Sequence, residues 1–214
     1  RDAVLGTRII NGKGESLHFG GEVIKNVAVY DASRLMAGAF GGLGLILEAS
    51  VRTAPLPAAE QTRMLTMDRK PALQKMQQLG RSTLPISGMA CHNQALFLRL
   101  SGNSASVTSA ANEVSGEHLQ ESNFWSELNQ QRHDFFQPRK PLWRLSLPPA
   151  CADLQLPGEQ LLDWGGAQRW LYSDAAGEEI RSMAAQAGGH ATLFKSPNRP
   201  QQPFELPASL MALH

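Results

Sequence analysis

Cysteine and charged residues are both scarce in this 214-residue chain. The two cysteines, Cys91 and Cys151, are far apart, which excludes a disulfide framework and a cysteine-rich zinc site and favours a reducing compartment. Charged residues make up only 18% of the chain, and 20 basic side chains nearly balance 19 acidic ones. Because no basic excess is available to follow a phosphate backbone, nucleic acid is not an expected partner.

Long apolar runs are missing as well. The longest uncharged stretch, residues 35–47, contains four glycines and is shorter than the about 20 apolar residues that a membrane span needs. The chain does not open with the basic region and apolar run of a signal peptide. We therefore predict a cytoplasmic protein with no membrane span, large enough for one large or two modest domains.

From both ends of the sequence we expect that this chain is a piece of a longer protein. The first residue is Arg1, and a strand-like run at residues 3–10 begins almost at once. At the other end, Pro207 precedes a helix-like segment, residues 208–214, that has no terminating cap. We expect that some parts of the functional site lie outside this sequence.

The first part of the chain predicts a hairpin, a short helix and a buried strand. Residues 3–10 and 16–19 are the expected hairpin strands, joined by a turn that begins with Asn11-Gly12. The short helix covers residues 32–37, and the buried strand covers residues 45–53.

Four glycines, Gly38, Gly41, Gly42 and Gly44, separate this helix from the strand. They allow two interpretations, a tight packing turn or a loop whose backbone N–H groups approach a flat or anionic ligand. The order of helix, loop and strand is the reverse of a dinucleotide-binding fingerprint, and no Gly-Lys-Ser/Thr sequence makes the loop a phosphate-binding P-loop.

A proline-rich linker at residues 55–59 predicts a domain boundary. The pattern after it is strand, helix, strand, strand, helix, and later strand, strand, strand, helix, strand. The predicted class is therefore α+β, with two related ferredoxin-like units forming an antiparallel sheet that is covered by helices on one face.

Arg169 is the first candidate site residue in this second part. We predict a two-residue Gly165-Gly166 hairpin that places Arg169 opposite Leu162, on the same face as Trp164. An arginine among apolar groups could clamp a substrate carboxylate. The structural alternative, which we favour, is that Arg169 stacks on Trp164 or pairs with an acidic side chain.

His190 is the second candidate, as a base that takes the hydroxyl proton of a substrate. The alternative is an ordinary histidine at the edge of a sheet, which we favour because a metal needs several ligands and His190 is alone. The other five histidines show no ligand spacing either, so no metal site is predicted.

Several stretches resemble a known family of flavoproteins. Residues 1–6, 19–31, 33–38 and 41–44 are similar to the second half of the FAD-binding domain of flavin oxidases related to vanillyl-alcohol oxidase, the PCMH-type domain. Residues 156–170 and 187–192 narrow the resemblance to the E subunits of bacterial glycolate oxidases.

The resemblance implies a division of the chain into three regions. Residues 1–57 would be the second half of the FAD-binding domain, residues 58–199 an α+β cap on the substrate side, and residues 200–214 a tail that returns toward the FAD domain. Gly38, Gly41, Gly42, Gly44 and Ile46 would contact FAD.

The resemblance also implies the reaction and the partners. A complex of E with D and iron–sulfur F subunits would oxidise glycolate to glyoxylate. Any association of this chain with the inner face of the membrane would be through that complex. Val29 stands where the family usually has Gly, and Gly42 where it often has Thr. Because the resemblance covers only the second half of the FAD-binding domain, we expect this chain alone to bind little FAD and to be inactive. The alternative is an assembly subunit that keeps a degenerate flavin-binding fold.

Overall fold

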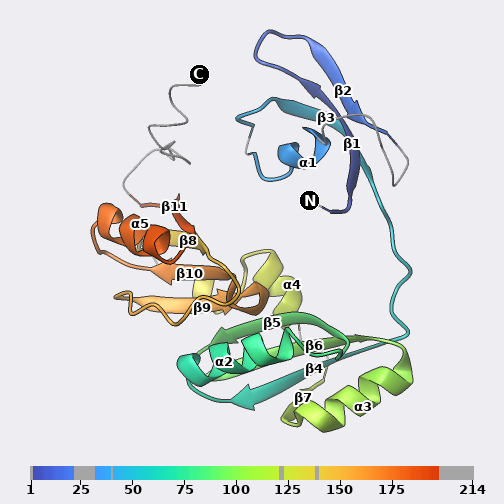
Figure 1. Cartoon of the computed structure of the whole chain (residues 1–214), viewed down its shortest axis with the longest axis vertical. Helices are drawn as coiled ribbons and strands as arrows, with labels where there is room; N and C mark the ends of the chain where they lie inside the picture. The colour runs from blue at the N-terminus through green and yellow to red at the C-terminus, as the bar shows by residue number, and fades with distance from the viewer. Residues whose placement is uncertain (1, 22–31, 40, 121–122, 138–139, 198–214) are drawn as a thin grey trace. The chain divides into compact units, whose positions relative to one another are not determined.

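The computed structural model describes residues 2–21, 32–39, 41–120, 123–137 and 140–197. The chain divides into two compact units, Arg1–Leu56 and Pro57–His214, which Figure 1 shows in blue and in green to red. The boundary falls in the proline-rich linker that the sequence indicates. The predicted tail, residues 200–214, lies outside the described residues.

The first unit is a three-stranded antiparallel sheet with one short helix. The strand order is β2-β1-β3, and helix α1 packs on β1 and β2. The predicted hairpin is confirmed, although the residue with positive φ in its turn is Gly14 rather than Gly12. The side chain of Asn11 accepts hydrogen bonds from the N–H groups of Lys13 and Glu15, which fixes the turn. The elements are β1 (Val4–Ile10), β2 (Ser16–Gly20), α1 (Ala32–Met36) and β3 (Leu45–Val51).

The predicted burial of the strand after the glycines is wrong. Strand β3 ends at Val51, and its side chains are largely exposed, including Leu45 at 65% and Ile46 at 44%. The physical reason is that β3 lies at the edge of the described sheet, while α1 covers the other two strands.

The second unit is built on an eight-stranded sheet in which all neighbouring strands are antiparallel. The order is β11-β8-β10-β9-β5-β6-β4-β7. The first half of this unit contains β4 (Ala59–Thr66), α2 (Arg69–Leu79), β5 (Ile86–His92), β6 (Ala95–Gly102), α3 (Ser104–Val114) and β7 (Glu117–Leu119). The second half contains α4 (Phe124–Asn129), η1 (Asp134–Phe136), β8 (Leu142–Ser146), β9 (Glu159–Asp163), η2 (Trp164–Gly166), β10 (Gln168–Tyr172), α5 (Gly177–Gln186) and β11 (His190–Lys195).

The two halves repeat one topology, and the α+β class is confirmed. The order β7-β4-β6-β5 in the first half and β11-β8-β10-β9 in the second is in both cases fourth, first, third, second strand, the ferredoxin-like order. The halves join where β5 meets β9, at the register pair Cys91 and Leu162. One connection differs: α2 links the first two strands of the first half, whereas residues 147–158 link those of the second half without a helix.

Helices cover both faces of the sheet, which corrects the prediction that they cover one. Helices α2 and α3 pack on the face that carries Leu98 and Leu162, and α5 packs against Leu171 on the same face. Helix α4 and the 3-10 turn η1 cover the opposite face with an aromatic cluster. The members of that cluster include Phe124, Trp125, Phe135, Phe136, Trp170 and Tyr172.

The hairpin between β9 and β10 has the predicted register but a longer loop. Arg169 lies opposite Leu162 and Gln168 opposite Asp163, as the sequence predicts. The loop is four residues long and includes η2, because Trp164, Gly165 and Gly166 all have positive φ. The corresponding turn of the first half, Asn93-Gln94, has only two residues.

Candidate functional site

The glycine loop of the first unit is held by its own turns. Gly38, Gly41 and Gly44 have φ values of 86°, 80° and 143°, which favour glycine. The N–H of Gly42 donates to the Ala39 carbonyl at 2.9 Å, and that of Gly44 donates to the Gly41 carbonyl at 3.3 Å. A Cβ at Gly44 would lie 2.8 Å from the Ile10 carbonyl oxygen, so this glycine lets the loop approach β1. These contacts support the packing-turn interpretation.

The same loop also has an open side. A Cβ added at Gly41 would meet no atom within 4 Å, and Ile46 on β3 is exposed. An open backbone beside apolar side chains can contact a flat apolar group. In this respect the described residues fit a flavin ring. Val29, the departure noted in the sequence, lies outside the described residues.

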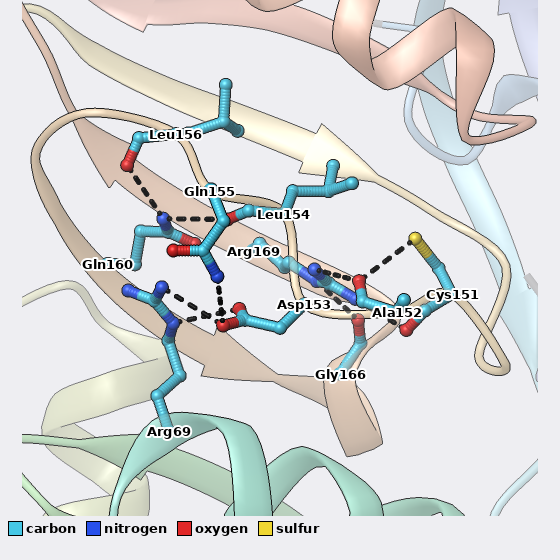
Figure 2. A network of polar contacts seen from close by, with 10 residues as sticks. All are labelled: Arg69, Cys151, Ala152, Asp153, Leu154, Gln155, Leu156, Gln160, Gly166 and Arg169. Carbon is cyan, nitrogen blue, oxygen red and sulfur yellow. Dashed lines mark hydrogen bonds and ion pairs between the residues drawn. The ribbon is translucent and has the colours of Figure 1, made fainter.

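Arg169 lies inside the second unit, and its side chain holds a loop (Figure 2). Its Nη1 and Nη2 donate to the carbonyls of Ala152 and Cys151 at 2.9 and 3.0 Å, and its Nε donates to the Gly166 carbonyl at 3.2 Å. Burial lowers the pKa of Arg169. As the side chain is fully buried among these acceptors, a substrate carboxylate cannot reach it without movement of the loop.

The predicted partners of Arg169 are therefore wrong in detail. Trp164 points outward and is 70% exposed, because the positive φ at Trp164 takes it out of the strand geometry. The nearby acidic residue, Asp153, pairs instead with Arg69 at the start of α2, through two hydrogen bonds of 2.9 and 3.2 Å. Figure 2 shows these two arginines on either side of the same loop, so residues 151–156 are tied to both halves of the unit.

His190 is exposed and begins β11, the edge strand of the sheet, opposite Ser146. This is the placement that the structural alternative predicts. Among the described residues, no three His, Cys, Asp or Glu side chains come together as metal ligands. The roles of Arg169 and His190 toward a substrate stay predictions.

A pair of histidines that the sequence does not single out meets at the end of β5. His92 Nε2 lies 2.9 Å from Glu159 Oε1, and the rings of His92 and His133 are 5.5 Å apart. Burial, and then the neighbouring His92, lowers the pKa of His133. These residues come from segments 41 and 67 positions apart, so no local spacing could have indicated the cluster.

Two hollows flank the tip of the β9–β10 hairpin, and Met89, Trp164 and Gly165 border both. The first, of about 350 Å³, reaches the face covered by α4 and is also lined by Ser87, Arg99, Trp125, Asn129 and Asp163. The second, of about 270 Å³, reaches the face covered by α2 and is also lined by Met76, Gln77, Arg81 and Pro149. Trp164 therefore stands between two concave surfaces at the junction of the halves.

Asp163 is a buried carboxylate at the base of this tip. Its Oδ1 accepts from the Trp164 N–H at 2.8 Å, and its Oδ2 accepts from Gln168 Nε2 at 3.3 Å. Burial raises the pKa of Asp163, while these two hydrogen bonds act in the opposite direction.

Among the described residues, no helix has the length and apolar character that crossing a membrane requires. No protein-family model matches the chain.

Comparison with curated proteins finds enzymes and enzyme subunits whose names specify the oxidation of small 2-hydroxy acids. The chain is 44% identical to glycolate oxidase subunit GlcE of Escherichia coli K12 over 207 residues, which is 97% of this chain and 59% of that protein. This confirms the resemblance to glycolate oxidase E subunits over nearly the whole sequence.

Shorter matches involve two further proteins. The chain is 39% identical to glycolate oxidase subunit GlcD of Bacillus subtilis 168 over 62 residues, 29% of this chain and 13% of that protein. It is 33% identical to a D-2-hydroxyglutarate dehydrogenase of Xanthomonas citri pv. viticola over 67 residues, 31% of this chain and 14% of that protein. The chain thus spans about three fifths of the GlcE protein and much smaller shares of the other two.

Proposed function

We propose that this chain is part of an E-type subunit of a glycolate oxidase complex, which oxidises glycolate to glyoxylate. The observation that carries the proposal is the 44% identity to GlcE over 97% of the chain, which spans both structural units. The partners in this proposal are a D subunit and an iron–sulfur F subunit. The predicted cytoplasmic location stays a prediction.

In this proposal the first unit is the second half of a PCMH-type FAD-binding domain, and the second unit is the cap. FAD, where bound, supplies the two-electron acceptor for the oxidation of the substrate carbon. The open backbone at Gly41 and the exposed Ile46 support a contact with the cofactor. We expect the purified chain alone to lack a flavin absorbance band, and a yellow protein with bound FAD would contradict this expectation.

A chimaera tests the proposed complex. The matched region of E. coli GlcE would be replaced by this chain and expressed in a strain that lacks GlcE. We expect the chimaera to copurify with the D subunit and to restore glycolate-dependent dye reduction, whereas the chain alone restores neither. A folded chimaera that neither copurifies nor restores reduction would contradict the proposal.

The buried position of Arg169 favours a second candidate function, a non-catalytic assembly subunit. Its guanidinium serves the backbone carbonyls of Cys151 and Ala152 rather than a ligand. His190→Gln in the chimaera separates the alternatives, since His190 is exposed and its replacement leaves the core intact. If His190 is a catalytic base, His190→Gln greatly lowers turnover while the complex still assembles. If the subunit serves only in assembly, His190→Gln leaves turnover unchanged.

A further inference from the structure

The tip residue Trp164 has an unfavourable backbone conformation that the surrounding structure maintains. Its φ is 50°, which is rare for a bulky side chain and costs free energy. Asp163 Oδ1 accepts the Trp164 N–H, and the Trp164 carbonyl accepts the N–H of Ala167. A Cβ at Gly166 would lie 2.4 Å from Leu73 Cδ1, so the tip also packs tightly on α2. These contacts hold the backbone from which the exposed indole projects.

The hollow on the α4 side of Trp164 is bounded by aromatic and charged groups. Trp125 forms part of its wall, and the Arg99 guanidinium lies over that ring at 5.3 Å. Arg99 is already engaged: its Nε donates to Ser87 Oγ at 2.9 Å, and Glu60 lies 4.0 Å away. The indole of Trp164, in contrast, is exposed to solvent.

Asp163 and Arg99 both line this hollow, but they do not form an ion pair with each other. Both oxygens of Asp163 accept from neutral donors, a backbone N–H and the amide of Gln168. No basic side chain among the described residues forms an ion pair with it. A buried carboxylate is costly unless it is paired, so the site favours a cation supplied from outside.

We propose that this hollow binds a guanidinium or ammonium group, which contacts the Asp163 carboxylate and lies against the indole of Trp164. Carboxylates form charge-assisted hydrogen bonds with such cations, and the indole face attracts them. A volume of about 350 Å³ accommodates the end of an arginine side chain or a small free cation. The inference does not depend on the proposed oxidase function.

Indole N–H resonances of the intact chain provide the test, since there are four tryptophans and Trp164→Phe identifies the signal of residue 164. The probe is N-acetylarginine amide, and its neutral control is N-acetylcitrulline amide. We expect a saturable shift of the Trp164 signal with a millimolar Kd for the arginine probe, and at least tenfold weaker binding of citrulline. Asp163→Asn keeps an oxygen for the Trp164 N–H, and we expect it to weaken binding of the arginine probe at least tenfold.

The proposal would be overturned if the arginine probe gave no saturable shift of the Trp164 signal. It would also be overturned if the arginine and citrulline probes bound equally well, or if Asp163→Asn bound the arginine probe as tightly as the unchanged chain does. A pentapeptide with arginine at its centre distinguishes the sources of the cation. Tighter binding of the peptide than of the free probe supports a partner polypeptide, and equal binding supports a small free cation.

Discussion

The two halves of the second unit share a strand order but differ in how they connect their first two strands. In the first half, α2 satisfies most of its own backbone hydrogen bonds. In the second half, residues 147–158 form no helix. Their carbonyls are met by side chains of the sheet, Arg169 at Cys151 and Ala152, and Gln160 at Leu154 and Leu156. An irregular segment in the place of a helix therefore depends on buried polar side chains beneath it.

Replacing Arg169 is the most severe test of this difference. We expect Arg169→Ala to lower the free energy of unfolding by about 4 kcal/mol, because it leaves buried carbonyls without donors and creates a cavity. Urea unfolding followed by tryptophan fluorescence measures this, since all four tryptophans lie in the second unit. Arg169→Lys should restore little, because lysine lacks the planar set of donors. The exposed Arg81 is the control, and an equal effect of Arg81→Ala would contradict the prediction.

Glycines at the ends of the two connections sharpen the comparison. Gly158 has φ 128°, and a Cβ there would lie 1.9 Å from the Tyr172 carbonyl oxygen, so we expect Gly158→Ala to cost about 3 kcal/mol. Gly80, after α2, has φ −63°, and we expect Gly80→Ala to cost less than about 1 kcal/mol. Urea unfolding of the two variants measures both losses of free energy. Similar losses would show that the backbone is equally constrained at the ends of the two connections.

A comparison of the two hairpin tips predicts that replacing Trp164 in the second tip will raise the free energy of unfolding. Asn93 in the first tip and Trp164 in the second both have positive φ, but this conformation costs less free energy for asparagine than for tryptophan. We expect Trp164→Gly to raise the free energy of unfolding by about 1 kcal/mol, since little packing is lost from an exposed side chain. Trp164→Asn should act in the same direction. A loss of stability in both variants would mean that the indole contributes more to packing than its exposure indicates.

The smallest expected effect is on pH dependence, from the histidines near the aromatic cluster. The pKa of His133 is lowered from 6.5 in the folded chain, so the unfolded chain binds more protons as the pH falls below about 6.5. The free energy of unfolding should therefore decrease as the pH falls from 7 toward 5, and His133→Gln should make this decrease smaller. Identical pH profiles for the two proteins would exclude His133 as its source.

Sequence patterns predict the parts of the fold that have local causes. Strand alternation and the Gly165-Gly166 pair were sufficient for the register of Arg169 against Leu162. The partners of Arg169 could not be predicted, because backbone carbonyls 17 and 18 residues upstream have no sequence signature. Likewise, the hollow beside Trp164 is formed by residues of β5, β6, α4 and the hairpin, which only the tertiary fold brings together.

The junction of the halves contains Cys91, whose pKa is raised by burial to about 11. At neutral pH this sulfur is a protonated thiol, which is a poor nucleophile. An alkylating reagent can modify it only when the packing around Cys91, which includes residues of α2, opens enough to admit both water and reagent. The rate of Cys91 alkylation, followed separately from that of the less buried Cys151, therefore measures how often the core at this junction opens.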